Sequence, residues 1–119
     1  MTRLQFWTSI LGTIEGAITP AKAYKYTTKL REKPKADHAT VWTVFDGSER
    51  GSDGEFLSSM LIQVDVWTMT SETQAETLYE AVRATLEAAG YERVSATRDL
   101  SEDDWFRLGS DWRFARAVR

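Results

Sequence analysis

The stretch LIQVDVWTMTSETQAETLYEAVRATLEAAGYERV, residues 61–94, joins the pattern of a half-buried strand to that of an amphipathic helix. Ile62, Val64 and Val66 alternate with polar or aromatic residues, which is the two-residue period of a strand with one buried face. Apolar residues then recur at helical spacing, at Ala75, Leu78, Tyr79, Val82, Leu86 and Ala89. These patterns predict a strand over 56–68 and a helix over 71–89.

Both ends of the predicted helix carry a boundary signal. Ser71 lies three residues before Gln74, the spacing of a capping box in which each side chain satisfies a free backbone donor of the other residue. Gly90 suits the left-handed residue that ends many helices, and Tyr91 is placed to pack back on Leu86.

The C-terminal segment has a second strand pattern. Its large apolar residues share one parity and its charged residues share the other, with Phe106, Leu108, Ser110, Trp112 and Phe114 facing one side. A two-residue turn at Gly109–Ser110 would bring Asp111 and Arg113 onto the apolar face. One continuous strand, bent at Gly109, is therefore favoured.

The rest of the chain supplies the remaining elements of a single domain, residues 1–119. An amphipathic helix is expected over 4–18, with its apolar stripe at Leu4, Trp7, Leu11, Ile14 and Ile18. An edge strand is expected near Tyr24, and a strand over 40–45 leads through a glycine-rich loop, 46–55, into the strand over 56–68. The predicted fold class is α+β, with an antiparallel sheet of about four strands and the two helices packed on one face.

Composition narrows the function further. The chain has no cysteine, which excludes disulfides, thiol catalysis and cysteine-ligated zinc. No run approaches the ~20 apolar residues of a membrane span, so no membrane association is expected. The net charge of −3 is unevenly spread: residues 1–45 carry +4, residues 46–104 carry −10 and residues 105–119 carry +3. Such a distribution favours head-to-tail pairing between copies, and the alternative is an unevenly charged, solvated surface.

Candidates for catalysis or metal binding are weak. His38 is the only histidine and lies beside Asp37, but a loop histidine without a nucleophile is usually a surface residue. Asp46, Asp53 and Glu55 miss the calcium-loop spacing because Arg50 stands where an oxygen ligand belongs. The acidic residues of the connector before the last strand are expected to keep it soluble, with Ser101 capping a short turn: Asp99, Glu102, Asp103 and Asp104. We expect no catalytic residue, no cofactor and no metal.

Residues 40–114 resemble the tail terminator, or tail completion, proteins of long-tailed bacteriophages. The resemblance rests on the strand, helix and Gly-aromatic step of residues 61–94, followed by an acidic connector and the strand DWFRLGSDWRFAR, residues 104–116. Residues 1–39 fit the family pattern only loosely, because the long basic connector over 22–35 departs from it.

The resemblance implies a structural virion protein rather than an enzyme. Such a protein forms a ring, usually a hexamer, that caps the tail tube and joins it to the head connector or stopper protein. DNA would pass through the ring without sequence-specific binding. The protein would be assembled in the host cytoplasm and reside in the tail or neck of the virion. Two alternatives remain: another neck or head-completion protein, or a small ferredoxin-like ligand-binding domain with a cleft of convergent polar groups.

The residues expected at subunit or partner interfaces are those that fit poorly inside a helix-covered core. Asp65 is expected on the open side of the sheet, facing a ring lumen or a neighbour. The other residues expected at an interface are two tryptophans, two arginines of the last strand and three charged residues of the glycine-rich loop: Trp67, Trp105, Arg107, Arg113, Glu49, Arg50 and Asp53.

Overall fold

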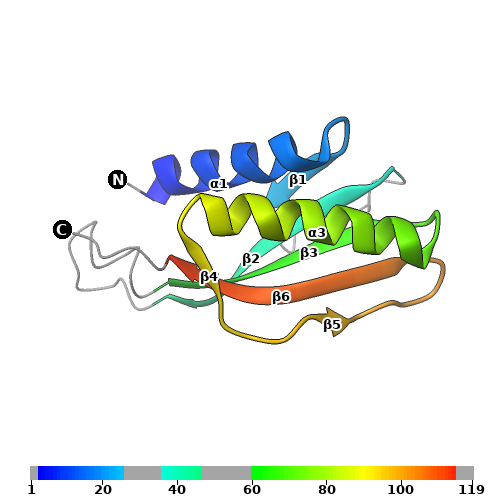
Figure 1. Ribbon diagram of the computed structural model, residues 1–119. Coiled ribbons are helices and arrows are strands. Elements are labelled where there is room, and N and C mark those ends of the chain that lie inside the picture. The colour runs from blue at the N-terminus through cyan, green and yellow to red at the C-terminus, as the bar shows by residue number, and fades with distance from the viewer. Residues whose placement is uncertain (1–2, 26–35, 47–59, 115–119) are drawn as a thin grey trace.

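The computed structural model describes residues 3–25, 36–46 and 60–114 (Figure 1). In chain order the elements are α1 (Arg3–Ile18), β1 (Lys22–Lys25), β2 (His38–Asp46), β3 (Met60–Thr68), α3 (Glu72–Ala88), β4 (Tyr91–Arg93), β5 (Arg98–Asp99) and β6 (Phe106–Phe114). The predicted loop contacts Glu49, Arg50 and Asp53 lie outside the described residues.

The α+β class is confirmed, but the expectation of about four antiparallel strands is wrong. The sheet has six strands in the order β1-β2-β3-β6-β4, and β5 also pairs with β6. β1 runs parallel to β2, whereas the other pairs are antiparallel. The prediction from sequence missed β5 and underestimated the number of strands, because strands of two or three residues are too short to show a hydrophobic period.

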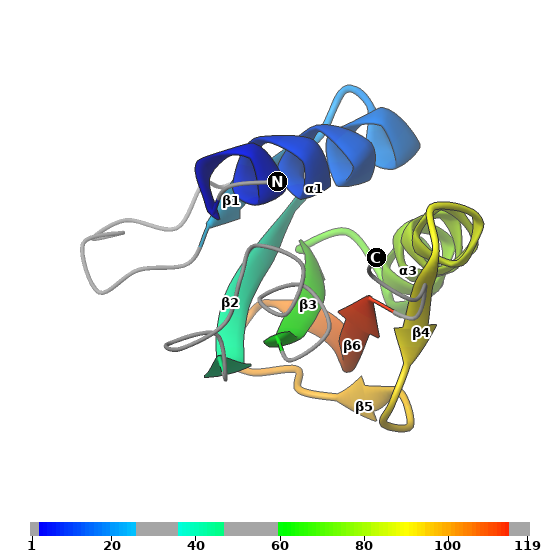
Figure 2. The same ribbon diagram turned by 90° about the vertical axis from the view of Figure 1, so that its left-hand side faces the viewer.

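Both helices lie on one face of the sheet, as expected (Figures 1 and 2). The antiparallel pairing of β2 with β3 is confirmed, with a bulge between Thr43 and Phe45. β6 is one continuous strand, also as predicted. A single hydrophobic core lies between the helices and the sheet, and its strand members include Val41, Ile62, Val64, Val66 and Trp112.

The buried stripe of α1 differs from the predicted one. Leu4 is 77% exposed and Leu11 is only partly buried, whereas Phe6 and Ile10 are buried. The buried residues follow an i, i+4 row that is completed by Ile14 and Ile18, with Trp7 beside it. The helix is rotated relative to the expectation because it packs against both α3 and the β1–β2 edge of the sheet.

The helix α3 matches its prediction closely, including its buried residues. Ser71 is the N-cap, and its Oγ accepts a hydrogen bond from the backbone N–H of Gln74 at 3.1 Å. The side chain of Gln74 makes no hydrogen bond back to the Ser71 N–H, and its Nε2 donates to Asp37 at 3.0 Å. Gly90 has a φ of 99°, the left-handed conformation that was expected.

Candidate functional site

The sheet face turned away from the helices is not the open surface that the sequence predicted. Over its half nearest the start of β6, this face carries a polar–aromatic layer made of His38, Thr40, Asp65, Trp67, Trp105 and Arg107. Asp65 and His38 are each 1% exposed, and Thr40 and Trp67 are each 3% exposed. The layer is therefore a second, smaller interior on the far side of the sheet.

Strand register builds the first row of the layer. His38 of β2 lies opposite Trp67 of β3, and Trp67 lies opposite Arg107 of β6. The imidazole stacks on the Trp67 indole with 5.8 Å between ring centroids and 5° between planes, and the Arg107 guanidinium lies 4.3 Å from the Trp67 ring centroid. Trp105 meets both rings edge-on, at 5.3 Å from His38 and 6.0 Å from Trp67. Stacking and cation–π attraction hold these three strands together.

A buried ion pair links Asp65, in the second row of the layer, to Arg107 in the first row. Asp65 lies between Thr40 and Gly109 in the register, and its Oδ2 accepts hydrogen bonds from Arg107 Nη2 at 2.6 Å and Nε at 3.1 Å. The Gln63 amide donates to both carboxylate oxygens at 3.0 Å. The Trp67 indole N–H donates to Thr40 Oγ1 at 2.9 Å, which joins the two rows.

Gly109 makes room for this carboxylate. A Cβ at position 109 would lie 1.7 Å from Asp65 Oδ1 and 2.7 Å from its Cγ, far inside van der Waals contact. The glycine is therefore needed for close approach between β3 and β6, a role that differs from the bend suggested by the sequence.

Burial dominates the electrostatics of the pair. It raises the pKa of the Asp65 carboxyl above its ordinary value, because the low-dielectric surroundings disfavour the charged form. The Arg107 hydrogen bonds and charge, together with the Gln63 hydrogen bond, act in the opposite direction without overcoming burial. Removing one partner would leave the other charge poorly solvated, so the two residues function as a unit.

Several interface predictions are corrected by this geometry. Asp65 does not face a lumen or a neighbour, and Trp67 is not a surface residue, because both are almost fully buried. The side chain of Arg107 is only 17% exposed and is committed to Asp65. Trp105 is half-buried. Of the predicted interface residues that the structure describes, Arg113 is the one that keeps an accessible charge, with a side chain that is 54% exposed and an ion pair to Glu92 at 2.9 Å.

The prediction that His38 lies on a surface loop is also wrong. It is buried rather than on a surface loop, because β2 begins at His38 and not at the predicted residue 40. Its Nδ1 lies 2.9 Å from the carbonyl oxygen of Ala36. The neighbouring Asp37 does not orient it; that carboxylate accepts the Thr68 hydroxyl at 2.6 Å and the Gln74 amide. The shared parity of His38 with Thr40 and Trp42 was the signal that could have revealed this position.

A second polar cluster, on the helix side, was not predicted at all. The Tyr79 hydroxyl of α3 lies 2.8 Å from the Ser110 hydroxyl and accepts hydrogen bonds from Thr97 at 2.9 Å and Arg93 at 3.2 Å. On the other side of β6, Arg98 pairs with Asp111 at 2.9 Å. These contacts tie the connector between β4 and β6 to the sheet, whereas helical spacing marked Tyr79 only as a core residue.

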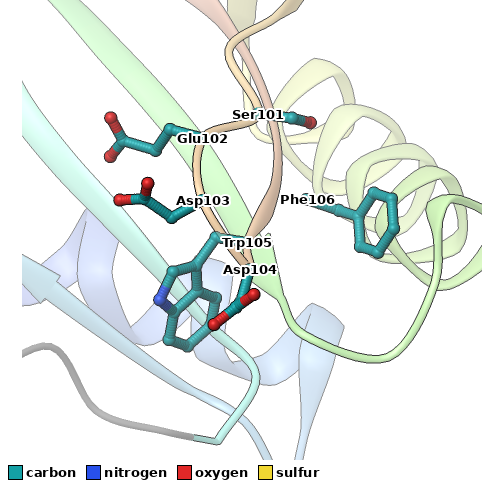
Figure 3. A pocket seen from close by; sticks show the side chains of 6 residues that line it. All are labelled: Ser101, Glu102, Asp103, Asp104, Trp105 and Phe106. Carbon is teal, nitrogen blue, oxygen red and sulfur yellow. The ribbon is translucent and has the colours of Figure 1, made fainter.

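The acidic connector before β6 ends in a tight turn, and a short turn was expected there. Glu102 and Trp105 exchange backbone hydrogen bonds of 3.1 and 2.9 Å, and Asp103 has a φ of 50°. The Ser101 hydroxyl accepts a hydrogen bond from the Arg107 backbone N–H at 3.1 Å. A hollow of about 420 Å³ is lined by residues 101–106. Figure 3 shows Glu102 and Asp103 on one side of the turn and Phe106 on the other.

Within residues 3–25, 36–46 and 60–114, no three histidine or acidic side chains lie close enough together to hold a metal ion. No helix in the same ranges is long and apolar enough to cross a membrane. The sequence matches no protein-family model, and a search of curated proteins finds no match either.

Proposed function

We propose that this protein is a structural component of a phage tail, a tail terminator whose copies form a ring. The ring, a hexamer by resemblance, caps the tail tube and carries the docking surface for the head connector or stopper protein. DNA passes through its lumen without sequence-specific contacts. The proposal includes no catalysis and no cofactor, and it places the protein in the virion after assembly in the host cytoplasm.

One observation carries this proposal beyond the resemblance of residues 40–114. In the polar–aromatic layer, the polar groups that could have formed a reaction centre are hydrogen-bonded to one another instead. Both oxygens of Asp65 accept hydrogen bonds from Arg107 or Gln63, and the Trp67 indole N–H is bound to Thr40. This pairing makes the sheet a rigid plate with helices on one side, which suits a subunit that works through its surfaces.

The chain's charge supports the same function. Asp65 was the residue expected to give an acidic lumen, and its burial removes it from that role. Among the described residues, accessible charges of opposite sign are found near the two ends of the sheet, at Arg113 and at the turn that contains Asp103 and Asp104. Contacts between such ends repeat identically around a closed ring and leave no open filament end.

Native mass spectrometry of the purified chain, with negative-stain imaging, tests the proposal. The expected result is one closed oligomer with an axial hole. Adding that oligomer to polymerising tail tube protein should stop tube growth at a defined end. A chain that stays monomeric at every concentration and does not bind tube ends would refute the proposal. A ring that binds the head connector but leaves tube growth unchanged would favour the other candidate, a neck or head-completion protein.

A further inference from the structure

The half of the far sheet face that the polar–aromatic layer does not fill presents a second surface. We name Trp42, Gln63, Arg98, Asp111 and Arg113 the open half-face. The register places Trp42 opposite Gln63 and Gln63 opposite Asp111, with Arg113 in the next row, about 7 Å further along β6. Trp42 is 36% exposed and the side chain of Arg113 is 54% exposed. Tryptophan and arginine are both enriched at protein interfaces, and here an accessible indole and an accessible guanidinium share one sheet face with β3 between them.

The charge of Arg113 is available to a partner. Its ion pair with Glu92 is exposed on both sides, with 54% and 49% of the two side chains accessible. Such surface ion pairs contribute little free energy, so Arg113 can exchange Glu92 for the carboxylate of a partner at little cost in free energy. The other arginine of the open half-face, Arg98, is paired with Asp111, whose side chain is only 16% exposed. Arg113 is therefore the residue of this surface best placed to recognise an acidic group.

A complementary acidic group lies at the opposite end of the same strand. β6 has nine residues, so its two ends are separated by roughly 27 Å. The turn Glu102–Trp105 directly precedes β6, and Arg113 is the second-last residue of that strand. Asp103 and Asp104 are exposed at the tip of this turn. Because β6 is rigid, these aspartates cannot reach Arg113 of their own chain.

We propose that the open half-face of one copy receives the turn Glu102–Trp105 of the next copy. In this contact Arg113 binds Asp103 and Asp104, and the Trp42 indole packs against the turn. The inference rests on the proposed ring and names its subunit contact. The contact joins two different patches, so it is heterologous, and its repetition closes a ring when the rotation between copies allows closure.

The conformation of the turn Glu102–Trp105 is fixed before binding by contacts within its own chain. Two backbone hydrogen bonds close it between Glu102 and Trp105, and Ser101 holds its base through the Arg107 backbone N–H. The Trp105 ring is fixed edge-on against His38 and Trp67. A rigid turn loses little conformational entropy on binding, which favours association. The geometry also explains why Arg107, which was predicted for the interface, takes no part in this contact, since it is bound to Asp65 inside its own chain.

A charge-swap experiment tests the contact. Arg113→Glu alone, and Asp103→Arg with Asp104→Arg, should each weaken association by about tenfold or more per contact, because each places like charges together. Combining all three substitutions should restore the oligomer, as measured by native mass spectrometry and sedimentation velocity. Far-UV circular dichroism should show the wild-type fold in every variant.

Arg83→Glu is the matched control, because Arg83 is a partly exposed arginine of α3 that forms ion pairs with Glu80 and Glu87 of the same helix. It changes the net charge equally and should leave the oligomer intact. An Arg113→Glu variant that forms the wild-type ring would overturn this contact while leaving the proposed ring standing. Failure of the combined variant to reassemble would also overturn it. A wild-type chain that forms no ring would instead refute the proposed function.

Discussion

Gly109→Ala is the most direct test of the buried ion pair. The new Cβ would lie 1.7 Å from Asp65 Oδ1 and 3.2 Å from the carbonyl oxygen of Val64, so the carboxylate must move. Moving it breaks the 2.6 Å contact with Arg107 in a site where Asp65 is 1% exposed. Disrupting a buried pair costs about 3–5 kcal/mol, a large part of the roughly 5–15 kcal/mol that stabilises a typical domain. We expect the free energy of unfolding, measured by urea denaturation, to fall by about 3 kcal/mol or more.

Two comparisons separate this cause from a general effect of replacing glycine. Gly12→Ala in α1 is the control, because a Cβ there meets no atom within 4 Å, and it should stabilise the protein by about 0.5–1 kcal/mol. In an Asp65→Ala background the two carboxylate atoms that clash are gone and only the 3.2 Å approach to the Val64 carbonyl oxygen stays, so adding Gly109→Ala should cost less than about 1 kcal/mol further. A Gly109→Ala protein within about 0.5 kcal/mol of wild type, or additive costs in the double variant, would show that Gly109 does not act by making room for the Asp65 carboxylate.

Three further substitutions test other parts of the fold. Val82→Asp places an unpaired charge at a 2% exposed position of α3 and should abolish the cooperative thermal transition; an unchanged melting temperature would contradict the packing of this helix. Ser71→Ala removes the cap that accepts from the Gln74 N–H and should lower the free energy of unfolding by about 1 kcal/mol in urea, whereas Ser71→Asp should keep most of it. Burial raises the pKa of Tyr91 from 10.0 to about 12, so its neutral form is favoured in the folded state; its contribution to stability is complete below pH 10 and is lost as the pH rises to about 12. Tyr91→Phe should remove that part of the alkaline loss of stability in denaturant melts at increasing pH, and an identical pH profile for the two proteins would contradict it.

The elements that could be predicted are those whose signal is local. The helix α3, its cap at Ser71 and its end at Gly90 depend on residues within a few positions of one another, and so does the alternation along β6. Hydrophobic period and backbone conformation act over one or two turns of chain, so one sequence displays them directly. Shorter elements such as β5 escaped prediction because two residues carry no period.

The far face of the sheet escaped prediction for a different reason. An alternating strand shows which residues share a face, but it does not show what covers that face. Asp65 and Arg107 are 42 positions apart, and Trp67 and Thr40 are 27 apart, so only strand register brings them together. The Asp65 carboxylate also depends on Gly109, because a Cβ at that position would lie 1.7 Å from its Oδ1.

Local sequence patterns thus specify where the longer strands and helices of this protein form and which side of α3, β3 and β6 is apolar. The tertiary structure alone decided that the polar side of the sheet is half buried, with its charges paired inside the chain, and that Arg113 rather than Arg107 remains accessible. The physical reason is the range of the forces involved. Backbone propensity and periodicity act between neighbours in sequence, whereas desolvation and ion pairing depend on neighbours in space.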